Sequence, residues 1–328
     1  MRRVILVTIT LALSTLTAAD PPQAEISNGS IKAKLYLPDA TNGYYRGTRF
    51  DWSGVIASLE YQGHNYFGVW FRRYDPKIND SITGPVEEYR TGESALGYAE
   101  AKPGENFVRI GVGLVKKPGD ETAYKQFRND YEIVDNGKWT VKTALDSVEF
   151  TQEVTDPVSG YGYLYKKTIR LAKDAPRMII EHSIRNTGKK VIETNVYNHE
   201  FFVIDNQPSG PDFTVKFPFD VKATANLMGL AEVSGKELHY LKELPQGPAV
   251  HSELTGFGDT AKDFDFRVEN RKTGASVHVT GDHALSKIDF WSPRATICPE
   301  AYIDLKIEPG KETHWQITYD FYVLPPAK

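Results

Sequence analysis

The chain has 328 residues, and its 39 Lys and Arg residues against 43 Asp and Glu residues give a formal net charge of −4 at pH 7. This mildly acidic balance argues against a nucleic-acid partner, since nucleic-acid-binding domains carry clusters of basic residues. The only cysteine, Cys298, excludes an intramolecular disulfide and lies too far along the chain to be the lipidated first residue of a lipoprotein.

The beginning of the chain has the pattern of a secretory signal peptide. Arg2 and Arg3 precede an uncharged apolar run over residues 4–16, and small residues follow at positions 17–19. The run is too short to span roughly 30 Å of hydrocarbon as a helix, and no later segment offers about 20 apolar residues in succession. We therefore expect cleavage after Ala19, a periplasmic or secreted product with a charge of −6 (37 basic against 43 acidic residues) and no membrane anchor.

Apolar and polar residues alternate along most of the remaining chain, which is typical of strands with one buried and one exposed face. In the last such segment Trp315, Ile317 and Tyr319 share one face, while Gln316 and Thr318 take the other. Turn-forming pairs such as Asn-Gly and Pro-Gly separate the segments. The segments expected to form strands are residues 31–37, 55–61, 107–115, 161–171, 178–184, 264–268, 277–279 and 315–323.

Helical periodicity over a dozen residues is nearly absent from the sequence, and a short helix is plausible only within residues 223–244. We therefore predict an all-β fold, with a single domain over residues 20–328 built from large stacked antiparallel sheets. Two long stretches, residues 75–102 and 206–263, are poor in strand pattern and rich in Gly, Pro, Glu and aromatic residues. Such stretches are expected to form the walls of a sugar-sized cleft.

A histidine follows one of the alternating segments, in the sequence Asn198-His199-Glu200-Phe201-Phe202. Imidazole titrates near neutral pH, so His199 is a candidate general acid or base. A core histidine that hydrogen-bonds to backbone is the alternative, and the local sequence does not separate the two.

A second candidate, Glu300, follows Cys298-Pro299 about a hundred residues later, and Trp291 and Arg294 precede it. A carboxylate among apolar residues tends to serve as a base or to pair with a cation such as Arg294. A solvated glutamate at a strand end is the alternative.

These two segments resemble elements of aldose 1-epimerases and related galactose-mutarotase-like proteins. Residues 198–202 are similar to the family's Asn-His-x-Tyr/Phe-Phe element, and residues 290–300 to its later Trp-Asn-Pro and Cys-x-Glu elements. The resemblance covers the second half of the chain, from about residue 161. It implies a β-supersandwich fold, with His199 as general acid and Glu300 as general base. Asn198, Trp291 and Arg294 are candidate substrate contacts in the same two segments.

The family usually has a substrate-binding arginine in an early strand or turn, and Arg49 is the best counterpart in this sequence. A guanidinium beside Asp51 can bind vicinal hydroxyls, and Trp52 can stack on the apolar face of a sugar. An ion pair between Arg49 and Asp51 with a purely structural role is the alternative. Glu87, in the first long stretch, is a further candidate contact, with a solvated loop position as its alternative.

Two other histidines favour structural roles. His64 is expected to be exposed at a hairpin turn, and His182 is expected in the core or at a ligand contact in the sheet centre. No close cluster of His, Cys and Asp marks a metal site, so we expect no metal or cofactor, with calcium bound by loop oxygens left open. The second histidine that many aldose 1-epimerases carry in their first half has no counterpart here, which leaves the sugar undefined.

The expected function is interconversion of the anomers of a sugar, with a mono- or oligosaccharide as the partner and no indication of oligomeric state. Two alternatives stay open, because one fold can host several chemistries. One is a polysaccharide lyase or another sugar-cleaving enzyme that uses His or Tyr with an Arg. The other is a carbohydrate-binding protein without turnover.

Overall fold

The structure, a computed structural model, describes residues 20–119 and 123–325, so the expected signal peptide over residues 1–19 lies outside the described residues. Its largest sheet has ten strands. In spatial order these are β16 (Ala231–Ser234), β17 (Glu237–Tyr240), β14 (Phe213–Lys216), β19 (Asp265–Asn270), β20 (Ala275–Gly281), β23 (Glu312–Val323), β12 (Arg177–Asn186), β11 (Gly162–Leu171), β10 (Ser147–Thr155) and β9 (Lys138–Thr143).

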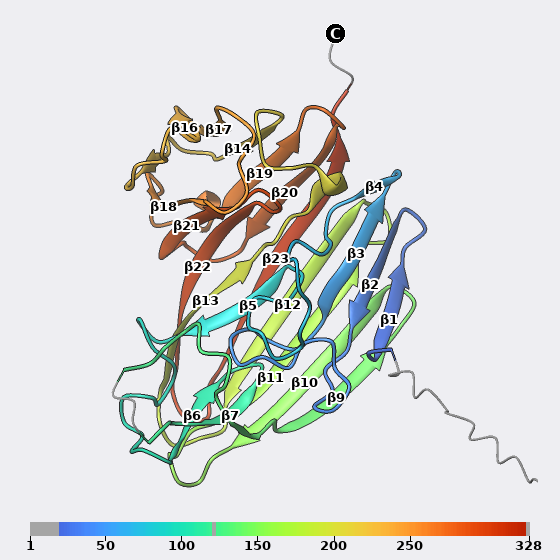
Figure 1. The fold of residues 1–328 in the computed structure, drawn as a ribbon. Helices are drawn as coiled ribbons and strands as arrows, with labels where there is room; N and C mark the ends of the chain where they lie inside the picture. The colour runs from blue at the N-terminus through green and yellow to red at the C-terminus, as the bar shows by residue number, and fades with distance from the viewer. Residues whose placement is uncertain (1–19, 120–122, 326–328) are drawn as a thin grey trace, which may run out of the picture.

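The second large sheet has six strands, all antiparallel to their neighbours. Their order is β15 (Lys222–Ala223), β18 (Val250–Thr255), β21 (Lys287–Ser292), β22 (Cys298–Ile307), β13 (Ile192–His199) and β5 (Val86–Arg90). In Figure 1, β5, β13 and β22 lie beside one another in front of the long strands of the ten-stranded sheet.

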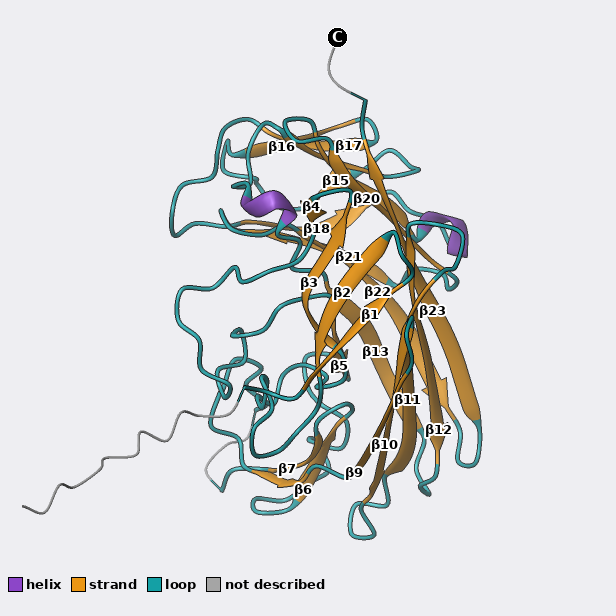
Figure 2. Cartoon of the chain, turned by 90° about the vertical axis from the view of Figure 1, so that its right-hand side faces the viewer, coloured by secondary structure: helices purple, strands orange, loops and turns teal. Residues whose placement is uncertain are grey.

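Two smaller sheets and two 3-10 helices complete the described elements. The four-stranded sheet contains β1 (Gln23–Ser27), β2 (Ile31–Tyr36), β3 (Val55–Tyr61) and β4 (His64–Asn65). The three-stranded sheet contains β6 (Asn106–Arg109), β7 (Gly113–Lys116) and β8 (Ile133–Asp135), and the 3-10 helices are η1 (Ile204–Asn206) and η2 (Ala261–Asp263). Figure 2 shows long loops gathered on the side of the molecule that faces away from β11, β12 and β23.

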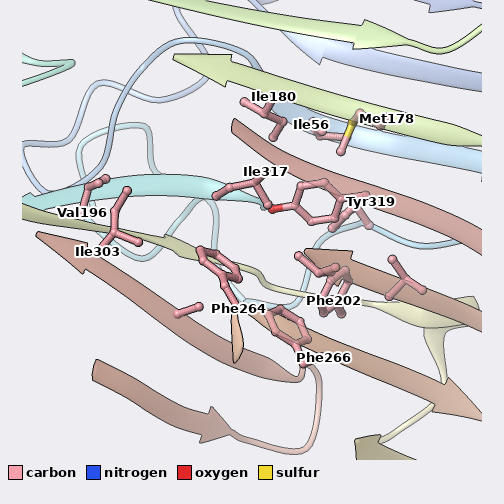
Figure 3. Packing of buried hydrophobic residues seen from close by; sticks show 14 of the residues in the cluster. Ile56, Met178, Ile180, Val196, Phe202, Phe264, Phe266, Ile303, Ile317 and Tyr319 are labelled. Atoms are coloured by element: carbon pink, nitrogen blue, oxygen red, sulfur yellow. The ribbon is translucent and has the colours of Figure 1, made fainter. Parts of the chain in front are cut away.

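The core lies between the two large sheets, where alternate residues of their strands meet. Figure 3 shows Val196 of β13 and Ile303 of β22 with Ile180, Ile317 and Tyr319 of the ten-stranded sheet, and all five are buried. Complete burial of such an aliphatic side chain contributes about 1.5–3 kcal/mol relative to leaving it exposed. The alternation that predicted the strands therefore reflects one shared apolar layer.

Alternation also decides which residues of the six-stranded sheet face away from the core. β22 buries Ala301, Ile303 and Leu305 against the ten-stranded sheet. Because successive side chains of a strand point to opposite faces, Glu300 and Tyr302 are directed to the outer face, toward the loops. This outer face carries the candidate site.

Three local expectations are wrong. Residues 107–115 form the hairpin of β6 and β7 rather than one strand, since Gly111 and Gly113 have φ values of 80° and 134° and let the chain reverse. The helix expected within residues 223–244 is absent from the described structure, where β16 and β17 form a hairpin around Gly235. The two stretches that are poor in strand pattern nevertheless contain β5 in one case and β14 to β18 in the other.

The all-β fold of large antiparallel sheets agrees with the expectation from the sequence. Among the residues that the structure describes, none of the helical segments has the length and apolar character required to cross a bilayer.

Candidate functional site

His199 and Glu300 lie side by side on the outer face of the six-stranded sheet. His199 is the last residue of β13, and Glu300 lies near the start of the neighbouring strand β22. The His199 Nε2 and Glu300 Oε1 atoms are 3.1 Å apart, and both side chains are more than nine-tenths buried. Antiparallel pairing of two strands thus joins residues that are about a hundred positions apart in the chain.

Aromatic rings surround the His199 imidazole. Phe201 stacks on it with ring centroids 3.7 Å apart, and Phe50 and Trp291 approach it edge-on at 5.6 and 5.4 Å. Phe201 has a φ of 43°, an unusual value for a residue with a side chain. Burial, with the charge of Arg49 added, holds the pKa of His199 well below its ordinary value of 6.5.

Glu300 experiences the opposite shift. Burial, followed by the nearby charge of Asp289, raises its pKa well above the ordinary value of 4.5. The Tyr302 hydroxyl donates a hydrogen bond of 3.4 Å to Glu300 Oε2. Burial therefore favours a protonated Glu300 carboxyl beside a neutral His199 imidazole. This neutral pair has the same number of protons as a carboxylate beside an imidazolium.

A pocket of about 420 Å³ opens beside the pair, and both side chains line it. Tyr197 and Tyr302 stack on each other at 4.2 Å to form part of its floor. Trp70 and Trp291 contribute to the wall, and Phe127, which is 66% exposed, lies at the rim. Aromatic surfaces interspersed with a few polar groups are typical of sites for small ligands.

Arg49 lines this pocket, as the resemblance implied for a substrate contact. Its guanidinium donates to Glu88 at 2.8 Å, to Asp80 at 2.6 Å and to the Tyr197 hydroxyl at 3.1 Å. A guanidinium has five N–H donors, so these three bonds leave two for other acceptors. The ion pair with Asp51 that the sequence suggested is replaced by pairs with Glu88 and Asp80.

Glu88 holds Arg49 in place from the floor of the site. Burial alone would raise the pKa of Glu88, but Arg49 and Arg109 together lower it below its ordinary value. Tyr197 donates a hydrogen bond of 2.5 Å to the same carboxylate, and Gln126 donates to both of its oxygens at 3.0 Å. Glu88 is therefore an ionised anchor rather than a proton carrier.

Glu87 and Asp51 belong to a buried cluster on the opposite face of β5. Glu87 forms an ion pair with Lys167 and a hydrogen bond of 2.8 Å with the His182 Nε2 atom, and all three side chains are fully buried. Burial alone would raise the pKa of Glu87, but Lys167 and His182 lower it to about 2. Asp51 accepts a hydrogen bond from Tyr165 at 2.9 Å and lies 3.7 Å from Lys167. The cluster joins the Arg49 loop to the ten-stranded sheet.

Three other candidate contacts also lie outside the pocket. Asn198 precedes His199 on β13, so its side chain turns to the core face and donates to the Tyr319 hydroxyl at 3.0 Å. The indole of Trp52 is buried and donates to a backbone carbonyl. Arg294 pairs with Glu243, so it is not the cation that faces Glu300. Of the predicted residues, the pocket brings together His199, Glu300, Arg49 and Trp291.

Several pocket residues were missed by the sequence reasoning. Tyr197 is two residues before His199, Tyr302 is two after Glu300, and Asp289 is two before Trp291. Period-two alternation places each on the same strand face as the residue that was identified. These residues could have been predicted from the sequence by taking every second residue on either side of each candidate.

The two histidines predicted to have structural roles make contacts within the fold. His64 lies next to the Gln62-Gly63 turn and is partly buried, with its Nδ1 atom 2.9 Å from Asp205. His182 is a core residue that stacks on Trp315 at 4.6 Å. Within residues 20–119 and 123–325, no three His, Cys, Asp or Glu side chains gather in a way that could hold a metal ion.

Comparison with known proteins reveals similarity at the level of structure. No protein-family model and no curated protein matches the sequence. A solved structure of a protein from Synechocystis sp. PCC 6803 matches with a TM-score of 0.57 and 12% identity over 96% of this chain and 100% of that one. A galactose mutarotase related enzyme from Lactobacillus acidophilus matches with a TM-score of 0.53 and 13% identity over 93% and 99% of the two chains. The chain has the galactose mutarotase-like fold.

An aldose epimerase homologue from C. elegans shares this galactose mutarotase-like fold, with a TM-score of 0.50 and 13% identity over 93% of this chain and 99% of that one. At these identities the likeness establishes the fold alone. The chemistry must be argued from the pocket of this chain, where the His199 imidazole and the Glu300 carboxyl lie 3.1 Å apart.

Proposed function

We propose that this protein is an exported carbohydrate-active enzyme that interconverts the α and β anomers of a reducing sugar. The observation that carries the proposal is the 3.1 Å contact between His199 and Glu300 in an aromatic pocket large enough for a sugar. The galactose mutarotase-like fold supports the same class of chemistry by analogy.

In the proposed reaction, Glu300 accepts the proton of the C1 hydroxyl while His199 donates a proton to the ring oxygen. The bond between C1 and the ring oxygen breaks and a C1 carbonyl forms. Rotation about the C1–C2 bond presents the other carbonyl face. As the ring closes, His199 takes back the proton of the hydroxyl that reforms the ring, and Glu300 returns its proton to the C1 oxygen. No co-reactant is consumed, and the enzyme ends with the protons it began with.

The neutral protonation states of Glu300 and His199 support this reaction cycle. Burial favours a neutral Glu300 carboxyl and a neutral His199 imidazole, and moving one proton from the first to the second produces the base and the acid. The transfer spans the 3.1 Å between Oε1 and Nε2 and requires no proton from solvent. The Nδ1 atom of His199 has no hydrogen-bond partner among the described residues, so Nε2 is the nitrogen that bonds to Glu300.

The two tyrosines of the pocket weigh against the lyase alternative. A tyrosine that abstracts a proton needs a lowered pKa. Burial instead raises the pKa of both Tyr197 and Tyr302, and Glu88 and Glu300 add to the increase. Each hydroxyl also donates its only proton to a glutamate oxygen, Tyr197 to Glu88 and Tyr302 to Glu300, so neither is suited to act as the base of a lyase.

Proton NMR of anomer exchange, with freshly dissolved sugars as substrates, tests the proposal. We expect the protein to accelerate exchange for at least one reducing sugar. The Glu300→Gln and His199→Asn variants should each lower that rate at least 100-fold, because general acid–base groups typically contribute 10²–10⁴-fold. Full rates in both variants would refute the assignment, and calorimetric sugar binding without any turnover would indicate a binding protein instead.

A further inference from the structure

A second hollow, of about 550 Å³, lies beside β13 and β22 and is lined by residues of both strands and of the loop over residues 91–100. Asn195 of β13 and Asp304 of β22 line it, and the two residues are register partners. Tyr197 and Tyr302, which line the first pocket, are the next register pair on the same face of the two strands. Two residues of a strand span about 6–7 Å, so the second hollow continues the first along β13 and β22.

One ion pair separates the two hollows. Arg90 and Glu93 line the first pocket, whereas Thr91, Gly92 and Ser94 line the second. The Arg90 Nη2 and Glu93 Oε2 atoms are 2.7 Å apart, and the Glu93 side chain is 96% exposed. Only the Glu93 end of the pair is open to solvent, since the Arg90 side chain is 12% exposed, and a bound molecule with its own acceptor can replace the Glu93 carboxylate at Arg90.

The polar groups of the second hollow select for a neutral ligand with hydroxyl groups. Asn195 Oδ1 is buried and has no hydrogen-bond partner within the described part of the chain, so it offers an acceptor. Glu193 and Asp304 add carboxylate acceptors, and Lys306 lies 4.0 Å from Glu193. Acceptors outnumber cations here, which favours the O–H donors of a neutral sugar over the carboxylates of a uronic acid.

We propose that the second hollow binds a further sugar unit of a neutral oligosaccharide whose reducing end lies beside His199 and Glu300. The inference rests on the proposed anomerase function for the role of the first pocket. Four residues of strand, about 13 Å, separate Asn195 from His199, a span that a short oligosaccharide covers and a single pyranose does not.

The test compares KM for glucose and xylose with KM for maltotriose, cellotriose and xylotriose, and uses trigalacturonate as an anionic probe. In the wild-type protein at least one neutral trisaccharide should have a lower KM than its monosaccharide, and trigalacturonate should show no such advantage. Asn195→Leu should raise the KM for the trisaccharide about two- to tenfold, the range expected for one lost hydrogen bond. Asn42→Leu, at an exposed loop position, is the matched control and should change neither value.

Equal KM values for mono- and trisaccharides in the wild-type protein would overturn the inference, as would equal effects of Asn195→Leu on both. Calorimetry with the same sugars separates this failure from failure of the proposed function. The protein could lack anomerase activity and still bind the trisaccharide more tightly than the monosaccharide, with the preference lost in Asn195→Leu. That result would support the second hollow as a sugar site and contradict only the proposed function. An active anomerase without the preference would contradict this role of the second hollow.

Discussion

The surroundings of His199 and Glu300 determine which proton states the two residues can adopt. Aromatic rings enclose the imidazole, and the carboxyl lies close to Asp289, so both groups favour their neutral forms. The raised pKa of Glu300 reduces stability at neutral pH, because the unfolded chain would hold this carboxyl ionised, whereas the lowered pKa of His199 reduces stability below pH 6.5, where the unfolded chain would hold the imidazole protonated. Reactive groups are commonly maintained in such unfavourable environments.

A bell-shaped dependence of kcat/KM on pH follows from the two shifts. Below the pKa of His199, which burial places under 6.5, the imidazole gains a second proton beside a carboxyl that is already protonated, and no base remains. Above the pKa of Glu300, which burial places over 4.5, the pair loses the proton that serves as the acid. The rate of anomer exchange, corrected for the buffer rate, should therefore be highest between the two pKa values. It should decrease toward acid pH with a midpoint below 6.5 and toward alkaline pH with a midpoint above 4.5.

The Glu300→Gln variant identifies the alkaline limb, which should disappear from its residual activity. A wild-type rate that rises through pH 4.5 and then stays constant would mean that Glu300 titrates as an ordinary carboxylate. Such a profile would contradict the neutral pair.

At the level of elements, β5 links the site to the core through two adjacent glutamates. Glu88 faces the pocket and binds Arg49, while Glu87 faces the ten-stranded sheet and binds Lys167 and His182. The Asp51 amide also donates to the Glu87 carbonyl at 2.9 Å. The position of the Arg49 guanidinium therefore depends on a polar cluster between the sheets.

Lys167→Met should destabilise the protein by about 3–5 kcal/mol, because it leaves the carboxylates of Glu87 and Asp51 buried without their shared cation. The matched control is Lys166→Met at the next position of β11. The Lys166 side chain is 48% exposed and lies 3.5 Å from Glu149, so its loss should cost less than about 1 kcal/mol. Urea unfolding measures both changes, and equal losses would show that the buried cluster adds nothing to stability.

At the scale of the whole molecule, the sequence predicted the fold class and the long strands β11, β12 and β23, since alternation in segments such as residues 315–323 reflects one buried face. No predicted segment covers the long strands β10 and β22. The prediction from sequence failed between residues 206 and 263, where β15 and β16 have two and four residues and are too short for a periodic signal. It also placed Glu87 rather than Glu88 on the pocket side of β5, because the face to which each side chain turns depends on pairing with β13.

Export is a proposal for the whole molecule that rests on the pattern of residues 1–19. Cleavage after Ala19 would give a mature protein that begins at Asp20, close to the start of β1 at Gln23. Expression of the full chain in a bacterium, cell fractionation and amino-terminal sequencing should find Asp20 as the first residue of a periplasmic or secreted product. An uncleaved chain that begins at Met1 and remains in the cytoplasm would contradict export.

The central claim is that His199 and Glu300 act as one unit on one sugar. The most direct test is a comparison of anomer exchange rates, measured by proton NMR, for the His199→Asn, Glu300→Gln and double variants. Two groups that exchange protons with the same substrate have strongly non-additive effects. We predict that the double variant will be within about threefold of the slower single variant, whereas losses that multiply, or single variants with wild-type rates, would contradict the account.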